Sequence, residues 1–123
     1  MAGARMRRVD EALRAVLGEA IATDLKDPRV GFVTVTGVKT SPDLREARVW
    51  VSVLGDEAER VASLDALQSA HGFLQARIAQ SLRLKRTPAL SFGYDESVDR
   101  GMRITELLAA QQEQSEAGDD EPR

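Results

Sequence analysis

The sequence predicts a two-layer α+β domain in which amphipathic helices cover one face of a small sheet. Two neighbouring segments alternate apolar and polar residues as half-buried strands do, and a shorter segment of this kind follows later in the chain. Before and between them, apolar residues recur every three or four positions, which is typical of helices that bury one face. At 123 residues, the chain has the length of one domain with one core.

The first helix is predicted over residues 5–25. Its apolar stripe consists of Val9, Leu13, Val16, Leu17, Ala20 and Ile21. The helix is expected to end before Asp27, because a residue that precedes a proline is pushed away from helical dihedral angles. A turn around Pro28 and Gly31 follows.

Two strands are predicted next, over residues 32–38 and 45–54, and they should form an antiparallel hairpin around the loop 39–44. Val33 and Val35 are expected to share one face of the first strand. In the second strand the apolar side consists of Ala47, Val49, Val51 and Val53, and the other side of Arg48, Trp50 and Ser52. The sheet face opposite the helices is expected to stay open.

Helical spacing returns over residues 57–70, with an apolar stripe at Ala58, Val61, Leu64 and Leu67. A second apolar stripe follows at Leu74, Ile78 and Leu82. Gly72 separates the two stripes, so we predict two helices that meet at a kink. Thr87 and Pro88 end the second helix, and a third strand alternates over residues 89–94. A final helix is predicted over residues 98–110.

Composition excludes several classes of protein. With 42% hydrophobic and 30% charged residues, the chain lacks the run of about 18–20 apolar residues that a membrane span requires. Asp10, Glu11 and Arg14 interrupt what would be the apolar region of a signal peptide. The chain contains no cysteine, which excludes disulfides and thiolate sites and fits a cytoplasmic location.

The net charge of −3 at first argues against a nucleic-acid partner. However, residues 111–123 hold five acids and one arginine, whereas residues 1–110 hold 16 basic and 15 acidic groups. The acidity therefore belongs to the tail, 111–123, which has too few apolar residues to offset the entropy of ordering and is expected to be disordered.

The sequence does not supply the parts of a common catalytic site. With no cysteine and a single histidine, hydrolase triads and histidine-rich metal sites are incomplete. Asp95, Glu96 and Asp99 could hold a divalent ion, but the calcium-loop pattern is absent, and capping of the last helix is the favoured interpretation. We therefore expect no enzyme, no cofactor and no metal.

Four segments, in this order, carry a resemblance to a known family: SPDLREARVWVSVLG, ALQSAHGFLQ, LRLKRTPAL and SFGYDESVDRGMRI. Together with the order of elements over residues 5–110, they resemble the bacterial ribosome-binding factor A family. The resemblance implies a KH-like fold of the second topological type (α-β-β-α-kinked α-β), here residues 1–110, with a C-terminal helix and the acidic tail. It also implies that an Ala-x-Gly kink replaces the usual Gly-x-x-Gly loop.

The function that the resemblance implies is assembly of the small ribosomal subunit. Members of this family bind the 30S subunit and 16S rRNA, act late in maturation, support processing of pre-16S rRNA and are linked to growth in the cold. An assembly GTPase assists their release. On this basis we expect a cytoplasmic, monomeric, non-catalytic protein that does not bind membranes.

The kink residues Ala70, His71 and Gly72 are the first candidates for RNA contact. A helix that begins at Gly72 would direct unpaired backbone N–H groups toward phosphate, and the missing side chain would let an RNA backbone approach. In KH domains the corresponding loop clamps the nucleotide backbone. Alternatively, Gly72 only joins two packed helices, and the role of His71 stays open.

Two basic groups are the second set of candidates. One comprises Arg83, Lys85 and Arg86, with Arg77 about two turns earlier. The other, expected to be mobile, comprises Arg5, Arg7 and Arg8. Clustered cations can neutralise phosphates even when the net charge is negative, but such residues also cover solvated faces or helix ends.

Two other functions remain open from the sequence. A generic KH-type protein would bind messages or small RNAs rather than ribosomal RNA. An adaptor would bind another protein through the open sheet or the acidic tail, and its complexes should survive high salt, whereas phosphate-driven binding weakens steeply with salt.

Overall fold

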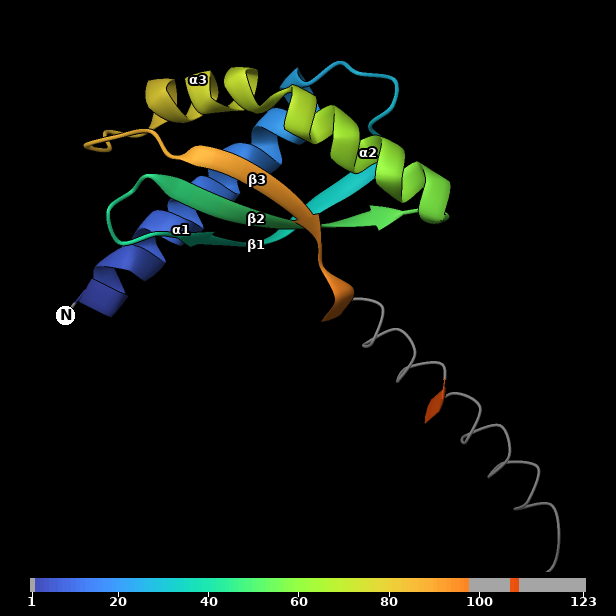
Figure 1. Ribbon diagram of the computed structural model, residues 1–123, viewed down its shortest axis with the longest axis horizontal. Helices are drawn as coiled ribbons and strands as arrows, with labels where there is room; N and C mark the ends of the chain where they lie inside the picture. Colours follow the sequence, from blue (N-terminus) through green and yellow to red (C-terminus); the bar gives the residue numbers. More distant parts are fainter. Residues whose placement is uncertain (1, 98–106, 109–123) are drawn as a thin grey trace, which may run out of the picture.

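The computed structural model describes residues 2–97 and 107–108, and in this part of the chain helices pack against a three-stranded sheet (Figure 1). The elements along the chain are α1 (Ala2–Glu19), which continues as the π-helical turn η1 (Ala20–Asp24), β1 (Phe32–Thr40), β2 (Glu46–Leu54), α2 (Glu57–Ser69), α3 (His71–Ser81) and β3 (Ala89–Tyr94). The predicted α+β class and the predicted order of these elements are confirmed. The predicted last helix, 98–110, and the acidic tail, 111–123, lie outside the described residues, except that Leu107 and Leu108 are helical.

The sheet has the order β1-β2-β3, with β1 antiparallel and β3 parallel to β2. A parallel pair needs a long crossover connection, and α2 and α3 supply it. The predicted alternation of β2 is confirmed, since Ala47, Val49, Val51 and Val53 are buried and Arg48 is exposed. On the second sheet face, Thr34 and Ser91 of the two outer strands are exposed, so the described helices leave this face open at these positions.

The core lies between the valine face of β2 and all three long helices. Leu13 and Leu17 of α1, Leu67 of α2, and Leu74 and Ile78 of α3 are fully buried in one cluster with these valines. Burying one such side chain contributes about 1.5–3 kcal/mol. These residues of the predicted stripes therefore attach the helices to the sheet. The predicted α2 stripe is wrong at its start, because Ala58 and Val61 are exposed and Ala66 is buried instead.

Helix α1 begins earlier than predicted, at Ala2 rather than residue 5. The expectation that Arg5, Arg7 and Arg8 form a mobile amino end is therefore wrong, because all three lie in this helix. The physical reason is that the apolar stripe extends backwards: Val9 packs against the core and Met6 is half-buried. The three arginines are exposed on a fixed helix.

Strand β1 is two residues longer than the predicted 32–38, because it contains a β-bulge. Thr36 is the extra residue, since Val35 pairs with Val51 whereas Gly37 pairs with Trp50. The bulge shifts the alternation by one residue, so that Thr40 faces the core and is buried. The backbone N–H of Thr40 donates to the Asp10 carboxylate at 2.8 Å, which fixes the end of β1 against α1.

The predicted kink between two helices is confirmed, and it lies at Ala70, between α2 and α3. The backbone N–H of Ala70 donates to Ala66 O, and that of Leu74 donates to Ala70 O, so hydrogen bonding continues through the bend. Two glutamines of these helices cover the outer edge of β3. The Gln68 amide donates to Leu90 O and accepts from Phe92 N, and the Gln75 amide donates to Pro88 O. These side chains pair an edge that would otherwise be free to aggregate.

The described residues contain no helix that is long and apolar enough to cross a membrane. The Asp95 carboxylate accepts the backbone N–H of Ser97 at 2.9 Å. The helix that Asp95, Glu96 and Asp99 are predicted to cap, 98–110, lies outside the described residues apart from Leu107 and Leu108. Asp99 lies outside the described residues.

Candidate nucleic-acid interface

The basic residues Arg83, Lys85 and Arg86 lie in the loop between α3 and β3, and all three are exposed. Leu82 ends α3 in an extended conformation, since helical dihedral angles stop at Ser81. In this loop, exposed cations alternate with the half-buried Leu84. The loop thus directs its charges outward and turns one leucine inward.

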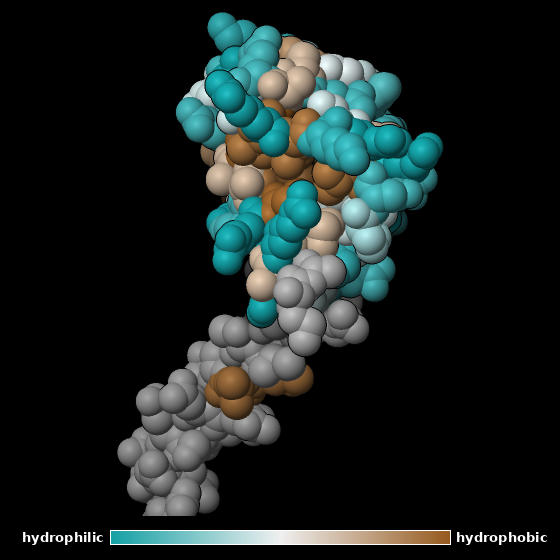
Figure 2. All heavy atoms as spheres, turned by 90° about the vertical axis from the view of Figure 1, so that its left-hand side faces the viewer, coloured by the Kyte–Doolittle hydropathy of each residue, from teal (hydrophilic) through white to brown (hydrophobic). Residues whose placement is uncertain are grey.

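Three segments that are far apart in the sequence surround one hollow of about 500 Å³ at this end of the molecule. They are the start of α1, the loop between β1 and β2, and the loop between α3 and β3. We call this site the basic hollow; its lining residues are Arg5, Met6, Val9, Pro42, Asp43, Leu44, Arg45, Arg83, Leu84, Lys85 and Arg86. Figure 2 faces this end and shows a hydrophobic centre surrounded by hydrophilic side chains.

The lining combines five apolar residues with five cations and one acid. Within residues 2–97, no carboxylate lies within ion-pair distance of Arg5, Arg83, Lys85 or Arg86. Cations without a protein partner keep their charge available for an external anion, such as a phosphate. The basic hollow is therefore a site with an apolar floor and an anion-attracting rim.

The loop between β1 and β2 is held rigidly by its own hydrogen bonds. The Ser41 hydroxyl donates to the Asp43 carboxylate at 2.7 Å, and the Arg45 backbone N–H donates to the same oxygen at 3.1 Å. These bonds lower the pKa of Asp43, with the Ser41 hydroxyl as the largest cause. Asp43 also pairs with the Arg45 guanidinium, 3.5 Å away. The one acid of the hollow is thus occupied by its own loop.

Leu44 adopts a left-handed backbone conformation in this loop, with φ of 61°. This region is uncommon for residues other than Gly, Asn and Asp, and it costs about 1–3 kcal/mol for a bulky side chain. The conformation is fixed by the Leu44 N–H, which donates to Ser41 O at 2.9 Å. The loop therefore stores strain while it presents an apolar side chain to the basic hollow.

The structure brings together some of the residues predicted from the sequence and separates others. Arg5 joins Arg83, Lys85 and Arg86 in the basic hollow, whereas Arg7 and Arg8 lie on α1 outside its lining. Arg45 completes the rim, and the sequence analysis missed it, because it lies about 40 residues from either basic group. In the sequence, only the position of Arg45 close to the turn residues Pro42 and Asp43 could have indicated that it belongs to the site.

Arg77, predicted with the basic group, lies instead beside α1. Its guanidinium forms an ion pair with the Asp24 carboxylate at 2.6 Å, and both side chains are about one-third exposed, 38% and 31%. A paired cation is less available for phosphate. Arg77 therefore connects α3 to the end of the first helical segment, and it does not line the basic hollow.

The kink residues Ala70, His71 and Gly72 lie away from the basic hollow, between α2 and α3. His71 and Gly72 are exposed. A Cβ atom added to Gly72 would meet no atom within 4 Å, so close packing inside the chain does not require a glycine there. Helix bending or close approach by an outside molecule remain as physical reasons for a glycine at this position.

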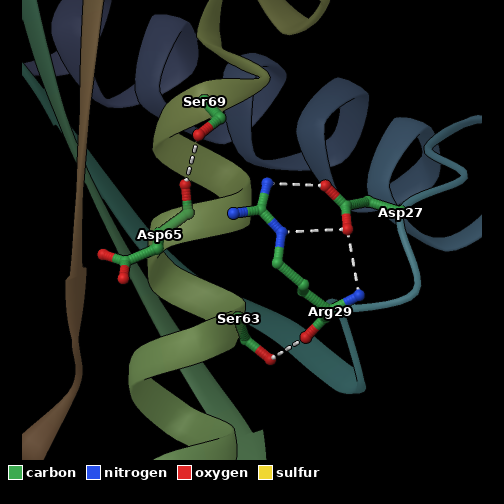
Figure 3. A network of polar contacts seen from close by, with 5 residues as sticks. All are labelled: Asp27, Arg29, Ser63, Asp65 and Ser69. Atoms are coloured by element: carbon green, nitrogen blue, oxygen red, sulfur yellow. Dashed lines mark hydrogen bonds and ion pairs between the residues drawn. The ribbon is translucent and has the colours of Figure 1, made fainter.

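The opposite end of the molecule, where β1 begins and α2 begins, is acidic and held by buried polar contacts (Figure 1). The Ser63 hydroxyl, 1% exposed, donates to Arg29 O and accepts from the Gly31 N–H. The Arg29 guanidinium pairs with Asp27, while the Asp65 carboxylate points away from it (Figure 3). The side-chain hydrogen bond from Arg29 lowers the pKa of Asp27.

Comparison with known proteins decides the family. The family model described as ribosome-binding factor A matches residues 5–108. The chain belongs to the ribosome-binding factor A family. A relative of that name from Anaeromyxobacter sp. (strain K) is 54% identical over an alignment of 121 positions, which covers 96% of this chain and 88% of the relative.

Solved structures of the family share the fold. The crystal structure of ribosome-binding factor A from Thermus thermophilus matches with a TM-score of 0.65 and 31% identity, over 72% of this chain and 94% of that one. A homology model of the Thermus thermophilus protein, fitted into the cryo-EM map of its 30S complex, matches with a TM-score of 0.60 and 32% identity, over 71% and 91% of the two chains. The KH-like fold implied by the sequence resemblance is confirmed.

Proposed function

We propose that this chain is a non-catalytic assembly factor that binds the small (30S) ribosomal subunit and its precursors through 16S rRNA. Membership of the family and the 30S complex of its Thermus thermophilus relative support the proposal. The observation that carries it is the basic hollow, where cations from three chain segments gather and those of α1 and of the loop before β3 have no ion-pair partner among the described residues. Phosphate contacts supply most of the affinity of such surfaces for RNA.

The finer steps of the proposal follow from the family. The protein acts late in small-subunit maturation as a cytoplasmic monomer, supports processing of pre-16S rRNA, is needed most in the cold, and leaves with the help of an assembly GTPase. The mechanism is a shift of populations: binding one rRNA conformation better than its competitors favours that conformation by no more than the difference in affinity. No covalent step is required of this chain.

Gradient sedimentation of tagged protein from cold-grown cells tests the proposal. Wild-type protein should travel with small-subunit precursors in preference to mature subunits. A variant with Arg83→Gln, Lys85→Gln and Arg86→Gln should stay at the top of the gradient, because it lacks three exposed cations of the basic hollow.

A second variant controls for the change of net charge. Leu54→Glu, Ala58→Glu and Val61→Glu also lower the net charge by three, but at exposed positions of the opposite end. This variant should sediment like wild type. If wild type stays at the top, the ribosomal function is wrong for this chain. If only the control variant stays at the top, the contact lies at the opposite end and not in the basic hollow.

A further inference from the structure

We propose that the basic hollow holds one unstacked nucleotide of single-stranded RNA, with its base on the apolar floor and its flanking phosphates on the cationic rim. The inference rests on the proposed function. It adds a ligand of defined size, one nucleotide, whereas a general electrostatic attraction to RNA would not need such a hollow. The volume of about 500 Å³ lies within the range of about 300–1,000 Å³ that is typical of small-ligand pockets.

The floor is the first argument for a base. Met6, Val9, Leu44 and Leu84 come from three separate segments and line the same hollow. Simple phosphate binding would be served by cations on a polar surface, and an apolar floor adds nothing to it. An exposed base has an apolar face that gains from leaving water, and single-stranded RNA offers such faces whereas duplex RNA stacks them.

The strained backbone of Leu44 is the second argument. Asparagine or glycine would occupy the left-handed conformation at lower cost, so stability alone does not favour leucine at this position. Leu44 is half-buried and belongs to the floor. Part of its apolar side chain stays open to the hollow, and an apolar contact with a ligand gives a further reason for leucine at this position.

The rim is the third argument. Arg5 lies on α1, Arg45 in the loop between β1 and β2, and Arg83, Lys85 and Arg86 in the loop before β3, so cations lie on several sides of the floor. A nucleotide within a strand carries one phosphate on each side of its sugar. Cations on several sides of an apolar centre match this arrangement better than they match a single anion. Asp43 does not oppose it, because its carboxylate is held by Ser41 and Arg45.

The test pairs two identical substitutions at opposite ends of the full-length protein. Leu44→Asn replaces the strained floor residue with a polar residue that tolerates its backbone conformation, and Leu54→Asn changes a leucine that is 70% exposed at the far end. The probe is a single-stranded RNA with the sequence of the leading end of 16S rRNA. One base of this probe is replaced by 2-aminopurine, whose fluorescence reports unstacking. The same RNA in a duplex is the competitor.

Wild type and Leu54→Asn should bind the single strand tightly, change the 2-aminopurine signal and discriminate against the duplex. Leu44→Asn should bind the single strand about tenfold more weakly, roughly the loss expected when one apolar side chain no longer covers the base. Its salt dependence should be unchanged, because the phosphate contacts remain. Its stability toward urea should equal or exceed that of wild type, which separates a lost contact from a damaged fold.

Equal binding by Leu44→Asn and Leu54→Asn, or equal binding of duplex and single strand, would overturn the inference while the ribosomal function stands. A wild-type protein that binds neither RNA, nor precursors in the gradient, would overturn both. An acidic peptide as the true occupant would appear as RNA binding that does not respond to Leu44→Asn.

Discussion

The two ends of the molecule both expose apolar surface next to charges that are mainly of one sign, but the charges have different origins. At the acidic end, Asp56 and Glu59 form a capping box at the start of α2, and Glu57 lies in the same first turn. Carboxylates at this place stabilise a helix by pairing its free N–H groups and its dipole. The acidic end thus has a local structural reason for its charges.

The basic end lacks such a local reason for most of its charges. Arg83 follows the end of α3 closely enough to interact with the helix dipole, but Lys85 and Arg86 lie further along the same loop, and Arg5 comes from the start of α1. Some arginines elsewhere pair with nearby acids, as Arg14 does with Glu11 and Arg29 with Asp27. The comparison teaches that a cluster of charges indicates a binding site when it is assembled from distant segments and its charges lack ion-pair partners. A cluster that caps the start of one helix already has a structural role and gives no such indication.

The largest expected difference between the ends is in RNA affinity and its salt dependence. Neutralising Arg83, Lys85 and Arg86 should make the negative slope of log K against log salt shallower by about 2, because each phosphate contact with a single strand contributes about 0.7. The affinity for RNA at 0.1 M salt should fall by about 100-fold. The three added carboxylates at Leu54, Ala58 and Val61 should leave the slope unchanged. Fluorescence titrations at several salt concentrations measure both, and equal slopes in the two variants would break the comparison.

The second prediction concerns stability at the acidic end. Ser63→Ala removes a buried hydroxyl and leaves Arg29 O and the Gly31 N–H without their partner, which should lower the free energy of unfolding by about 1–3 kcal/mol. Urea denaturation measures the loss, with the exposed Ser91→Ala as control. RNA affinity should stay within about twofold of wild type, since Ser63 lies outside the basic hollow; a large loss of affinity would show that the ends are coupled.

The sequence was sufficient to predict the elements that depend on local periodicity. The four valine and alanine positions of β2 repeat with a period of two, and Leu74 and Ile78 of α3 repeat with a period of about 3.6; the structure buries them as predicted. In α2 the prediction is only partly right, because Leu67 is buried but Ala58 and Val61 are exposed. The bulge at Thr36 was not predictable in this way, because one extra residue shifts the alternation without a change of composition. The strand therefore extends to Thr40, beyond the predicted end.

The candidate site was predictable only in part, because tertiary contacts decide which cations are free. Arg83 and Arg77 look alike in the sequence, yet Arg77 meets Asp24, which lies 53 residues earlier. Arg45 looks like an ordinary turn residue until the loop is placed beside α1 and the loop before β3. The left-handed conformation of Leu44 was likewise hidden, since nothing about a leucine predicts it.

The smallest expected effect is electrostatic and tests how rigid the basic end is. In the folded protein the pKa of Asp43 is lowered, first by the Ser41 hydroxyl and then by the Arg45 N–H. A lowered folded-state pKa stabilises the fold at pH values above the unfolded pKa, about 3.9 for aspartate. This contribution is lost as the pH falls through the lower, folded value.

Carbon-detected NMR of the carboxylates should therefore find the Asp43 midpoint below the ordinary range, and Ser41→Ala should raise it toward that range. Asp27 is the internal control, because its pKa is lowered by Arg29 and should not respond to Ser41→Ala. An Asp43 midpoint that Ser41→Ala leaves unchanged would mean that the hydroxyl does not hold the carboxylate. Asp43 would then be free to repel phosphate, and the basic end would lose the feature that distinguishes it from the acidic one, namely a rim on which only the cations are available to a ligand.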